Sequence, residues 1–150
     1  MNLRIPPIVQ FLICALLAWA LAMLVPQLAF GSPLSAYAGY GLIFAGAILL
    51  TLAILAFVRA RTTVNPLAPE QAQALVTSGL YRFTRNPMYL AMALILIGGA
   101  FALGNIAALA TPAIFVCVMT ELQIKPEERA LQSIFGEAFS AYRKQTRRWL

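Results

Sequence analysis

The chain has 150 residues, of which 61% are hydrophobic and only 11% are charged, and its mean hydropathy is +0.81. This composition excludes an ordinary water-soluble globular domain and predicts an integral membrane protein. The net charge of +6 therefore describes one membrane face, in contact with anionic lipid headgroups, and does not indicate a nucleic-acid surface. We predict a single all-α domain, residues 1–150, with four transmembrane helices, a cytoplasmic connector and a C-terminal amphipathic helix.

The first two spans lie in a stretch without charge, residues 5–58. One helix of that length would measure about 80 Å, whereas the hydrocarbon core is about 30 Å thick, so the chain must fold back. We predict spans at residues 8–25 and 37–58. Four turn-forming residues separate them: Pro26, Gly31, Ser32 and Pro33. The first span also has features of a signal peptide, with Ala36-Tyr37-Ala38 as a cleavage site, but its length favours a retained span.

A second stretch without charge covers residues 86–120. A single helix from residue 88 to residue 120 would measure about 50 Å, again too long for one crossing. Gly104-Asn105 is the natural turn, so we predict the third and fourth spans at residues 87–103 and 106–123.

Four spans place both termini and the middle connector on one side of the membrane. All 11 Lys and Arg residues fall on that side. By the positive-inside rule this side is cytoplasmic, and the expected location is a plasma membrane or inner membrane of the bacterial type.

Metal chemistry is not expected. The chain has no His and no Asp, and Cys14 and Cys117 lie far apart in predicted spans, so no cluster has the spacing of metal ligands. No phosphate-binding loop or nucleophile motif occurs either. Any chemistry therefore depends on an organic cofactor.

The connector and the start of the third span, residues 62–89, carry the first candidate site elements. Two tyrosines, Tyr81 and Tyr89, lie close to Asn86 in the stretch LVTSGLYRFTRNPMY. Each tyrosine alone is typical of an interfacial anchor. Together they could line a pocket in which a cation packs over ring faces.

The C-terminal segment, residues 124–150, carries the second element. Apolar residues recur there at helical spacing and predict an amphipathic helix: Leu131, Ile134, Phe135, Ala138, Phe139 and Tyr142. Glu127 and Glu128 stand at its head. One explanation is stabilisation of the helix N-terminus, typically worth less than about 1 kcal/mol. The other is that at least one carboxylate accepts hydrogen bonds from a ligand.

Taken together, LVTSGLYRFTRNPMYLA and the later EERALQSIFGEAFSAYRKQTRRWL resemble the isoprenylcysteine carboxyl methyltransferase family and the related phospholipid N-methyltransferases. These are small membrane enzymes that use S-adenosylmethionine. The resemblance implies an S-adenosylmethionine-dependent membrane methyltransferase. The cofactor-binding residues that it implies are Gln73, Leu75, Val76, Tyr81, Asn86, Pro87, Met88, Tyr89 and Glu127. Many relatives have His where this chain has Asn86, which can hydrogen-bond but cannot titrate.

The acceptor stays open between an isoprenylcysteine-like carboxylate, an amine, a thiol and another lipid-like group. In the isoprenylcysteine enzymes an arginine one helical turn before the matching glutamate is thought to hold the substrate carboxylate. That position here is Gln123, and Lys125 is the candidate substitute. Glu128 is the nearby candidate for a general base, needed only if the acceptor arrives protonated.

Two other functions are alternatives at this stage. A four-helix transporter would need an ionisable residue in a span, and only Glu121, at the cytoplasmic end of the fourth, approaches this. A non-catalytic scaffold could use Gly41 and Ala45, at small-xxx-small spacing, to pack helices within the chain or between copies. Membrane lipids are expected partners in every case, and the oligomeric state stays open.

Overall fold

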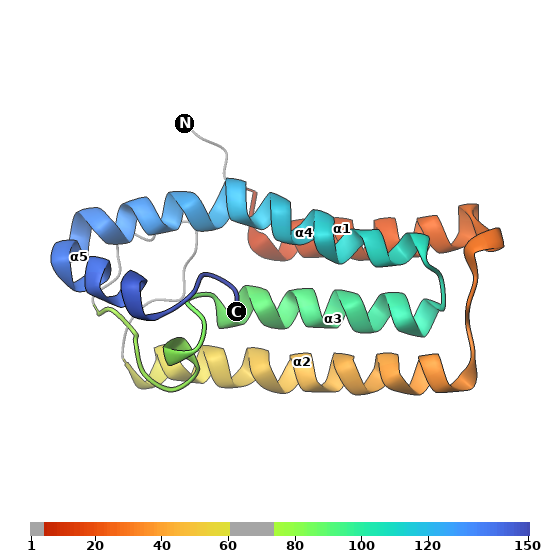
Figure 1. Ribbon diagram of the computed structural model, residues 1–150, viewed down its shortest axis with the longest axis horizontal. Coiled ribbons are helices and arrows are strands. Elements are labelled where there is room, and N and C mark those ends of the chain that lie inside the picture. Colours follow the sequence, from red (N-terminus) through yellow and green to blue (C-terminus); the bar gives the residue numbers. More distant parts are fainter. Residues whose placement is uncertain (1–4, 61–73) are drawn as a thin grey trace.

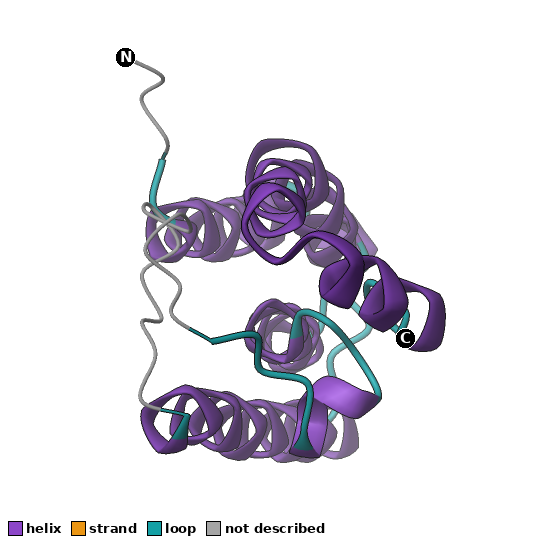
Figure 2. Cartoon of the chain, turned by 90° about the vertical axis from the view of Figure 1, so that its left-hand side faces the viewer, coloured by secondary structure: helices purple, strands orange, loops and turns teal. Residues whose placement is uncertain are grey.

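The computed structural model describes residues 5–60 and 74–150, and over these ranges it is helical, with two isolated β-bridges and no strand. Figure 1 shows the helices lying lengthwise beside one another in a bundle. They are α1 (Pro7–Leu24), α2 (Pro33–Arg59), α3 (Pro87–Leu103), α4 (Ala110–Met119) and α5 (Lys125–Gln145). The end-on view in Figure 2 shows one helix, α3, in the middle, between α2 on one side and the pair α1 and α4 on the other.

Three helical segments are long and apolar enough to cross a membrane: Pro7–Leu24, Pro33–Arg59 and the continuous Ala107–Gln145. The remaining helix, α3, is apolar and has 17 residues, which gives a length of about 26 Å. The prediction of an all-α membrane protein is confirmed. The second helix begins earlier than predicted because Ser32 and Ser35 form a reciprocal capping box and Pro33 takes the first helical position.

At one end of the bundle the two interhelical loops hold each other. The predicted turn is present, with Gly104 in the left-handed conformation at φ 59°. The Asn105 side chain donates a hydrogen bond to the carbonyl of Val25 at 2.9 Å, and the Phe30 N–H donates to the carbonyl of Gly104 at 2.7 Å. This end is fixed, and α5 and the segment from residue 74 to the start of α3 lie at the other.

Close packing of α2 on α3 depends on glycines other than the expected pair. A Cβ built on Gly39 or on Gly98 would lie 2.5–2.6 Å from a backbone oxygen of the facing helix. By contrast, Gly41 has no atom within 4 Å of such a Cβ, and Ala45 is exposed. The expectation that Gly41 and Ala45 pack helices within the chain is therefore wrong, because these positions face outward.

The fourth span continues into α5 without a break, through a π-helical turn at Thr120–Ile124. We expected the span to end at residue 123 and a separate helix to follow. The physical reason lies in Pro126, which has no N–H for the carbonyl one turn earlier and whose ring crowds that carbonyl. A widened turn before the proline keeps the helix going and buries Gln123.

The C-terminal helix bends at Gly136, whose φ of 50° and ψ of −120° are not helical. Beyond the bend, α5 runs back toward the start of α3 (Figure 1). The predicted C-terminal helix is therefore present, but a bend that the sequence did not indicate divides it. Of the expected apolar stripe, Phe139 and Tyr142 are buried, while Ile134 and Ala138 are exposed.

A buried apolar cluster joins α1, α3 and α4. It contains Cys14, Tyr89, Ala93, Leu96, Phe115, Met119 and Ile124. The tyrosine at the start of α3 is thus seated in the core, with its hydroxyl directed toward the first turn of α5, as its hydrogen bond there shows.

Candidate active site

Tyr81 belongs to a short 3₁₀ turn, Gly79–Arg82, and only 5% of it is exposed. Its ring packs edge-on against Phe57 of α2, with ring centroids 5.3 Å apart. The hydroxyl of Tyr142, from the returning part of α5, donates a hydrogen bond to the Tyr81 carbonyl at 2.7 Å. The turn Gly79–Arg82 is thereby held between α2 and α5.

Glu127 joins the start of α3 to the head of α5. The hydroxyl of Tyr89 donates to its Oε1 atom at 2.7 Å, and Nε2 of Gln123 donates to the same oxygen at 2.6 Å. Gln123 precedes Glu127 by one helical turn, which places both side chains on one face. The RNPMY segment and the acidic head of α5 are therefore in direct contact.

The phenol of Tyr81 stays neutral in this surrounding. Burial raises its pKa, and the neighbouring Tyr142 and the negative charge of Glu127 raise it further. We call Tyr81, Tyr89, Gln123 and Glu127 the acid–tyrosine cluster. It combines a carboxylate with two aromatic rings, and this is a combination that attracts an organic cation.

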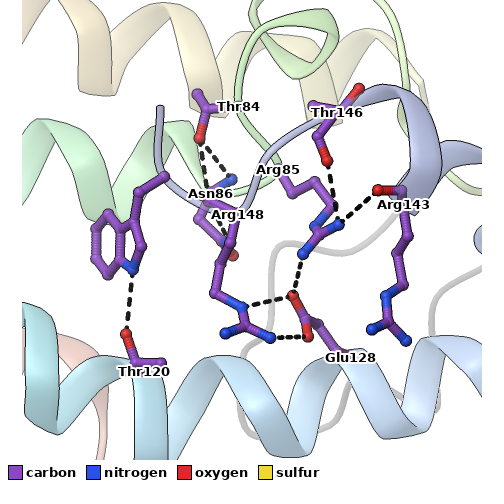
Figure 3. A network of polar contacts seen from close by, with 9 residues as sticks. Thr84, Arg85, Asn86, Thr120, Glu128, Arg143, Thr146 and Arg148 are labelled. Atoms are coloured by element: carbon purple, nitrogen blue, oxygen red, sulfur yellow. Dashed lines mark hydrogen bonds and ion pairs between the residues drawn. The ribbon is translucent and has the colours of Figure 1, made fainter.

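Glu128 points to different partners from those of its neighbour. Its carboxylate accepts a hydrogen bond from Nη2 of Arg85 at 2.8 Å. It accepts two more from Arg148, from Nε at 3.0 Å and from Nη2 at 2.7 Å. The side chains of Arg85 and Glu128 are each only 10% exposed. Figure 3 shows this carboxylate between the two guanidinium groups, and it also shows Arg143 nearby.

These contacts argue against Glu128 as a general base. Burial raises its pKa, but the hydrogen bond from Arg148 and the positive charges of Arg85, Arg148 and Arg143 outweigh burial and hold the pKa below the usual 4.5. A base that works near neutral pH needs a raised pKa. The structure instead gives Glu128 the role of an ion-pair centre.

The C-terminal tail ties this network together, and sequence reasoning missed it. Asn86 Nδ2 donates to the carbonyl of Arg148 at 2.9 Å, and Thr84 Oγ1 donates to the same carbonyl at 3.2 Å. The indole N–H of Trp149 donates to Thr120 Oγ1, at the π-helical turn, at 3.1 Å. The dense basic run ending in Trp was a signal for an interfacial element, but not for these partners.

The other predicted residues fall in several places. Gln73 lies outside the described residues. In the segment before the 3₁₀ turn, Leu75 is half-buried and Val76 is buried. Pro87 is buried at the first position of α3, and Met88 packs against the apolar cluster.

Two predicted polar residues, Asn86 and Lys125, have side-chain partners outside the acid–tyrosine cluster. The side-chain N–H₂ of Asn86 is used by the tail, as described. Lys125 forms an ion pair with Glu121, and both side chains are substantially exposed. Since Lys125 lies two positions before Glu127, it projects from nearly the opposite side of the helix. The structure therefore does not bring Lys125 to the acid–tyrosine cluster.

Fold and site together define an integral membrane protein with an acidic, aromatic cluster at one end of a helical bundle. A model of the phospholipid methyltransferase family matches residues 34–138. The chain belongs to this family, and it is a membrane methyltransferase.

Two relatives extend this result. An uncharacterized protein of Haemophilus influenzae is 41% identical over 63 residues, which cover 42% of this chain and all of that protein. The protein-S-isoprenylcysteine O-methyltransferase of Schizosaccharomyces pombe is 31% identical over 70 residues, 47% of this chain and 30% of the relative. The chain thus matches less than a third of that enzyme's length. No solved structure matches the chain.

Proposed function

We propose that this protein transfers a methyl group from S-adenosylmethionine to a small or lipid-like acceptor that enters from the membrane. The observation that carries the proposal is the pair of hydrogen bonds that Tyr89 and Gln123 donate to Glu127. They join the RNPMY segment to the acidic head of α5, the two motifs on which the resemblance to the family depends.

The residues of the acid–tyrosine cluster fit the cofactor's chemistry. A sulfonium or an ammonium group is attracted by aromatic faces and by a carboxylate. Tyr81 and Tyr89 supply the faces, and Glu127 supplies the carboxylate. The adenosine would require an apolar slot, for which Leu75, Val76 and Met88 are the candidates.

Bound there, the cofactor supplies an activated methyl group on a positively charged sulfur. The chain's own contribution is to orient and to exclude water. Tyr89 and Gln123 fix the carboxylate of Glu127 in one position, and Tyr142 fixes the backbone of Tyr81. Holding two reactants in line is worth about 7–11 kcal/mol in well-oriented systems. A general base is needed in addition only if the acceptor arrives protonated, as a thiol would.

The acceptor site is expected beside Gln123, one turn before Glu127. Gln123 is 1% exposed, and it brings an amide rather than a cation to this position. Lys125, on the opposite side of the helix, does not replace a missing arginine. This favours an amine, a thiol or another uncharged lipid-like group over a carboxylate, because a buried carboxylate without a cation would be costly.

We also propose that this end of the bundle is cytoplasmic, in a plasma or inner membrane of the bacterial type. Arg59, Arg82, Arg85 and the basic residues of α5 gather at this end of the bundle, in agreement with the positive-inside rule.

The proposal is tested by calorimetry with the purified full chain in detergent. S-Adenosylmethionine is expected to bind, and Glu127→Gln and Tyr89→Phe are each expected to weaken binding about tenfold or more, about 1.4 kcal/mol. The matched control is Glu121→Gln, which removes an exposed carboxylate on the same helix and should leave binding unchanged. Absence of heat with the unsubstituted protein, or equal weakening by the control, contradicts the proposal.

A further inference from the structure

A basic groove lies on the side of α5 that faces away from Glu127. It is a hollow of about 370 Å³ lined by Lys125, Glu128, Arg129, Gln132, Arg143 and Arg148. The first four recur at i, i+3, i+4 and i+7, so they share one helix face. The bend at Gly136 brings Arg143 and Arg148 back to form the opposite wall.

The walls of the basic groove are fixed relative to each other. Nε2 of Gln132 donates hydrogen bonds to the carbonyl of Gly136 at 2.9 Å and to Oγ of Ser140 at 3.0 Å, which joins the two parts of α5. Nη1 of Arg85 donates to the backbone carbonyl of Arg143 at 3.2 Å. Hydrogen bonds thus hold the two walls of the groove in fixed positions.

Positive charge in the groove exceeds what its acidic residue neutralises. Both carboxylate oxygens of Glu128 are already bonded to Arg85 and Arg148. Within residues 5–60 and 74–150, neither Arg129 nor Arg143 has a carboxylate partner. The guanidinium of Arg143 instead lies over the ring of Phe139, 6.0 Å from its centroid.

The position of the groove indicates the source of its ligand. Lys125 directly follows the π-helical turn that ends the fourth span, and Leu122, one turn earlier, is 54% exposed. Cations next to exposed apolar side chains at the end of a span lie at the depth of lipid headgroups. Guanidinium groups bind phosphate through paired N–H donors.

We propose that the basic groove binds a phosphate group, supplied by the headgroup of an anionic phospholipid at the membrane surface or by a soluble phosphate compound. Arg129 and Arg143 are the principal ligands, with Lys125 adding charge at the mouth. This site is separate from the acid–tyrosine cluster, and the proposal does not depend on methyl transfer.

Thermal unfolding of the purified full chain in an uncharged detergent tests the proposal. The probes are dioctanoyl phosphatidylglycerol, inorganic phosphate and dioctanoyl phosphatidylcholine, all at matched ionic strength. Phosphatidylglycerol is expected to raise the unfolding midpoint in a saturable way, and phosphatidylcholine much less, because its quaternary ammonium group meets the cations of the groove. A response to inorganic phosphate as well identifies a site for phosphate from either source, and a response to phosphatidylglycerol alone identifies a lipid site.

Variants localise the effect. Arg129→Gln and Arg143→Gln are each expected to weaken the response to phosphatidylglycerol by roughly fivefold or more, and Arg129→Lys, which keeps the charge but loses the paired donors, should weaken it less. Arg82→Gln removes one exposed cation outside the groove and serves as the control. The proposal is overturned if none of the probes shifts the midpoint of the unsubstituted protein, or if Arg82→Gln weakens the response as much as Arg129→Gln does.

Discussion

Adjacent glutamates at the head of α5 have different tasks because successive helical residues point about 100° apart. Glu127 faces α3 and accepts a hydrogen bond from Tyr89, whereas Glu128 faces the returning tail and forms an ion pair with Arg148. Sequence reasoning singled out both acids, but its role for Glu128 as a candidate general base does not fit the ion pairs of that carboxylate. The partner that decides the matter, Arg148, lies 20 positions away along the chain, and no local spacing indicates it.

Replacement of Glu128 by Gln is expected to destabilise the protein by about 3 kcal/mol at neutral pH, because Arg85 would keep a mostly buried charge without its partner. The sign of the pH effect follows from the lowered pKa of Glu128. Its contribution to stability is complete above the unfolded value near 4.5 and is lost as the pH falls through the lower folded value.

The measurement is the free energy of unfolding in detergent between about pH 7 and pH 3. The unsubstituted protein should lose stability at the acidic end, while the Glu128→Gln protein should change less over the same interval. Glu121→Gln, at an exposed ion pair, should cost less than about 1 kcal/mol. Equal losses of unfolding free energy in the two variants would show that the ion pairs of Glu128 stabilise the protein no more than the exposed pair does.

Between α2 and α3 the helix backbones approach so closely that a single added methyl group would overlap the facing helix. Gly98 faces the backbone of Gly39, whereas its neighbour Gly99 faces open space. Gly98 and Gly99 therefore form a matched pair for comparison: a Cβ fits at Gly99 but not at Gly98.

Replacement of Gly98 by Ala is expected to cost about 1–3 kcal/mol, because the new methyl group would overlap a backbone oxygen 2.6 Å away and force the helices apart. Replacement of Gly99 by Ala should be neutral or stabilising by up to about 1 kcal/mol, because alanine is the better helix former. Unfolding midpoints of the two variants check this. A similar loss at both positions would contradict the close helix contact.

At the scale of the whole molecule, hydropathy and charge predicted most of the fold. Stretches without charge give the spans, and the left-handed Gly104 gives the turn between the third and the fourth. The π-helical turn and the bend at Gly136 could not be predicted, since an apolar period of 3.6 assumes a straight helix. Gly136 carries no local sign of its conformation, and the contacts of the tail with Arg85 span about 60 residues.

The same limit applied to the site. The motifs show which segments meet, and Tyr89 with Glu127 was within reach of that reasoning. Helical spacing places Gln123 on one face with Glu127 and turns Lys125 away. Residue type alone could not show that Gln123 belongs to the acid–tyrosine cluster and that Lys125 does not.

The central claim is that the acid–tyrosine cluster encloses the methyl donor. The most direct measurement is an experimental structure of the full chain with S-adenosylhomocysteine, the stable product of the donor. The account predicts density for its sulfur beside the rings of Tyr81 and Tyr89, with its amino group within hydrogen-bond distance of Glu127. Density for the compound at another surface, with the Tyr89–Glu127 hydrogen bond undisturbed and its surroundings empty, would contradict it.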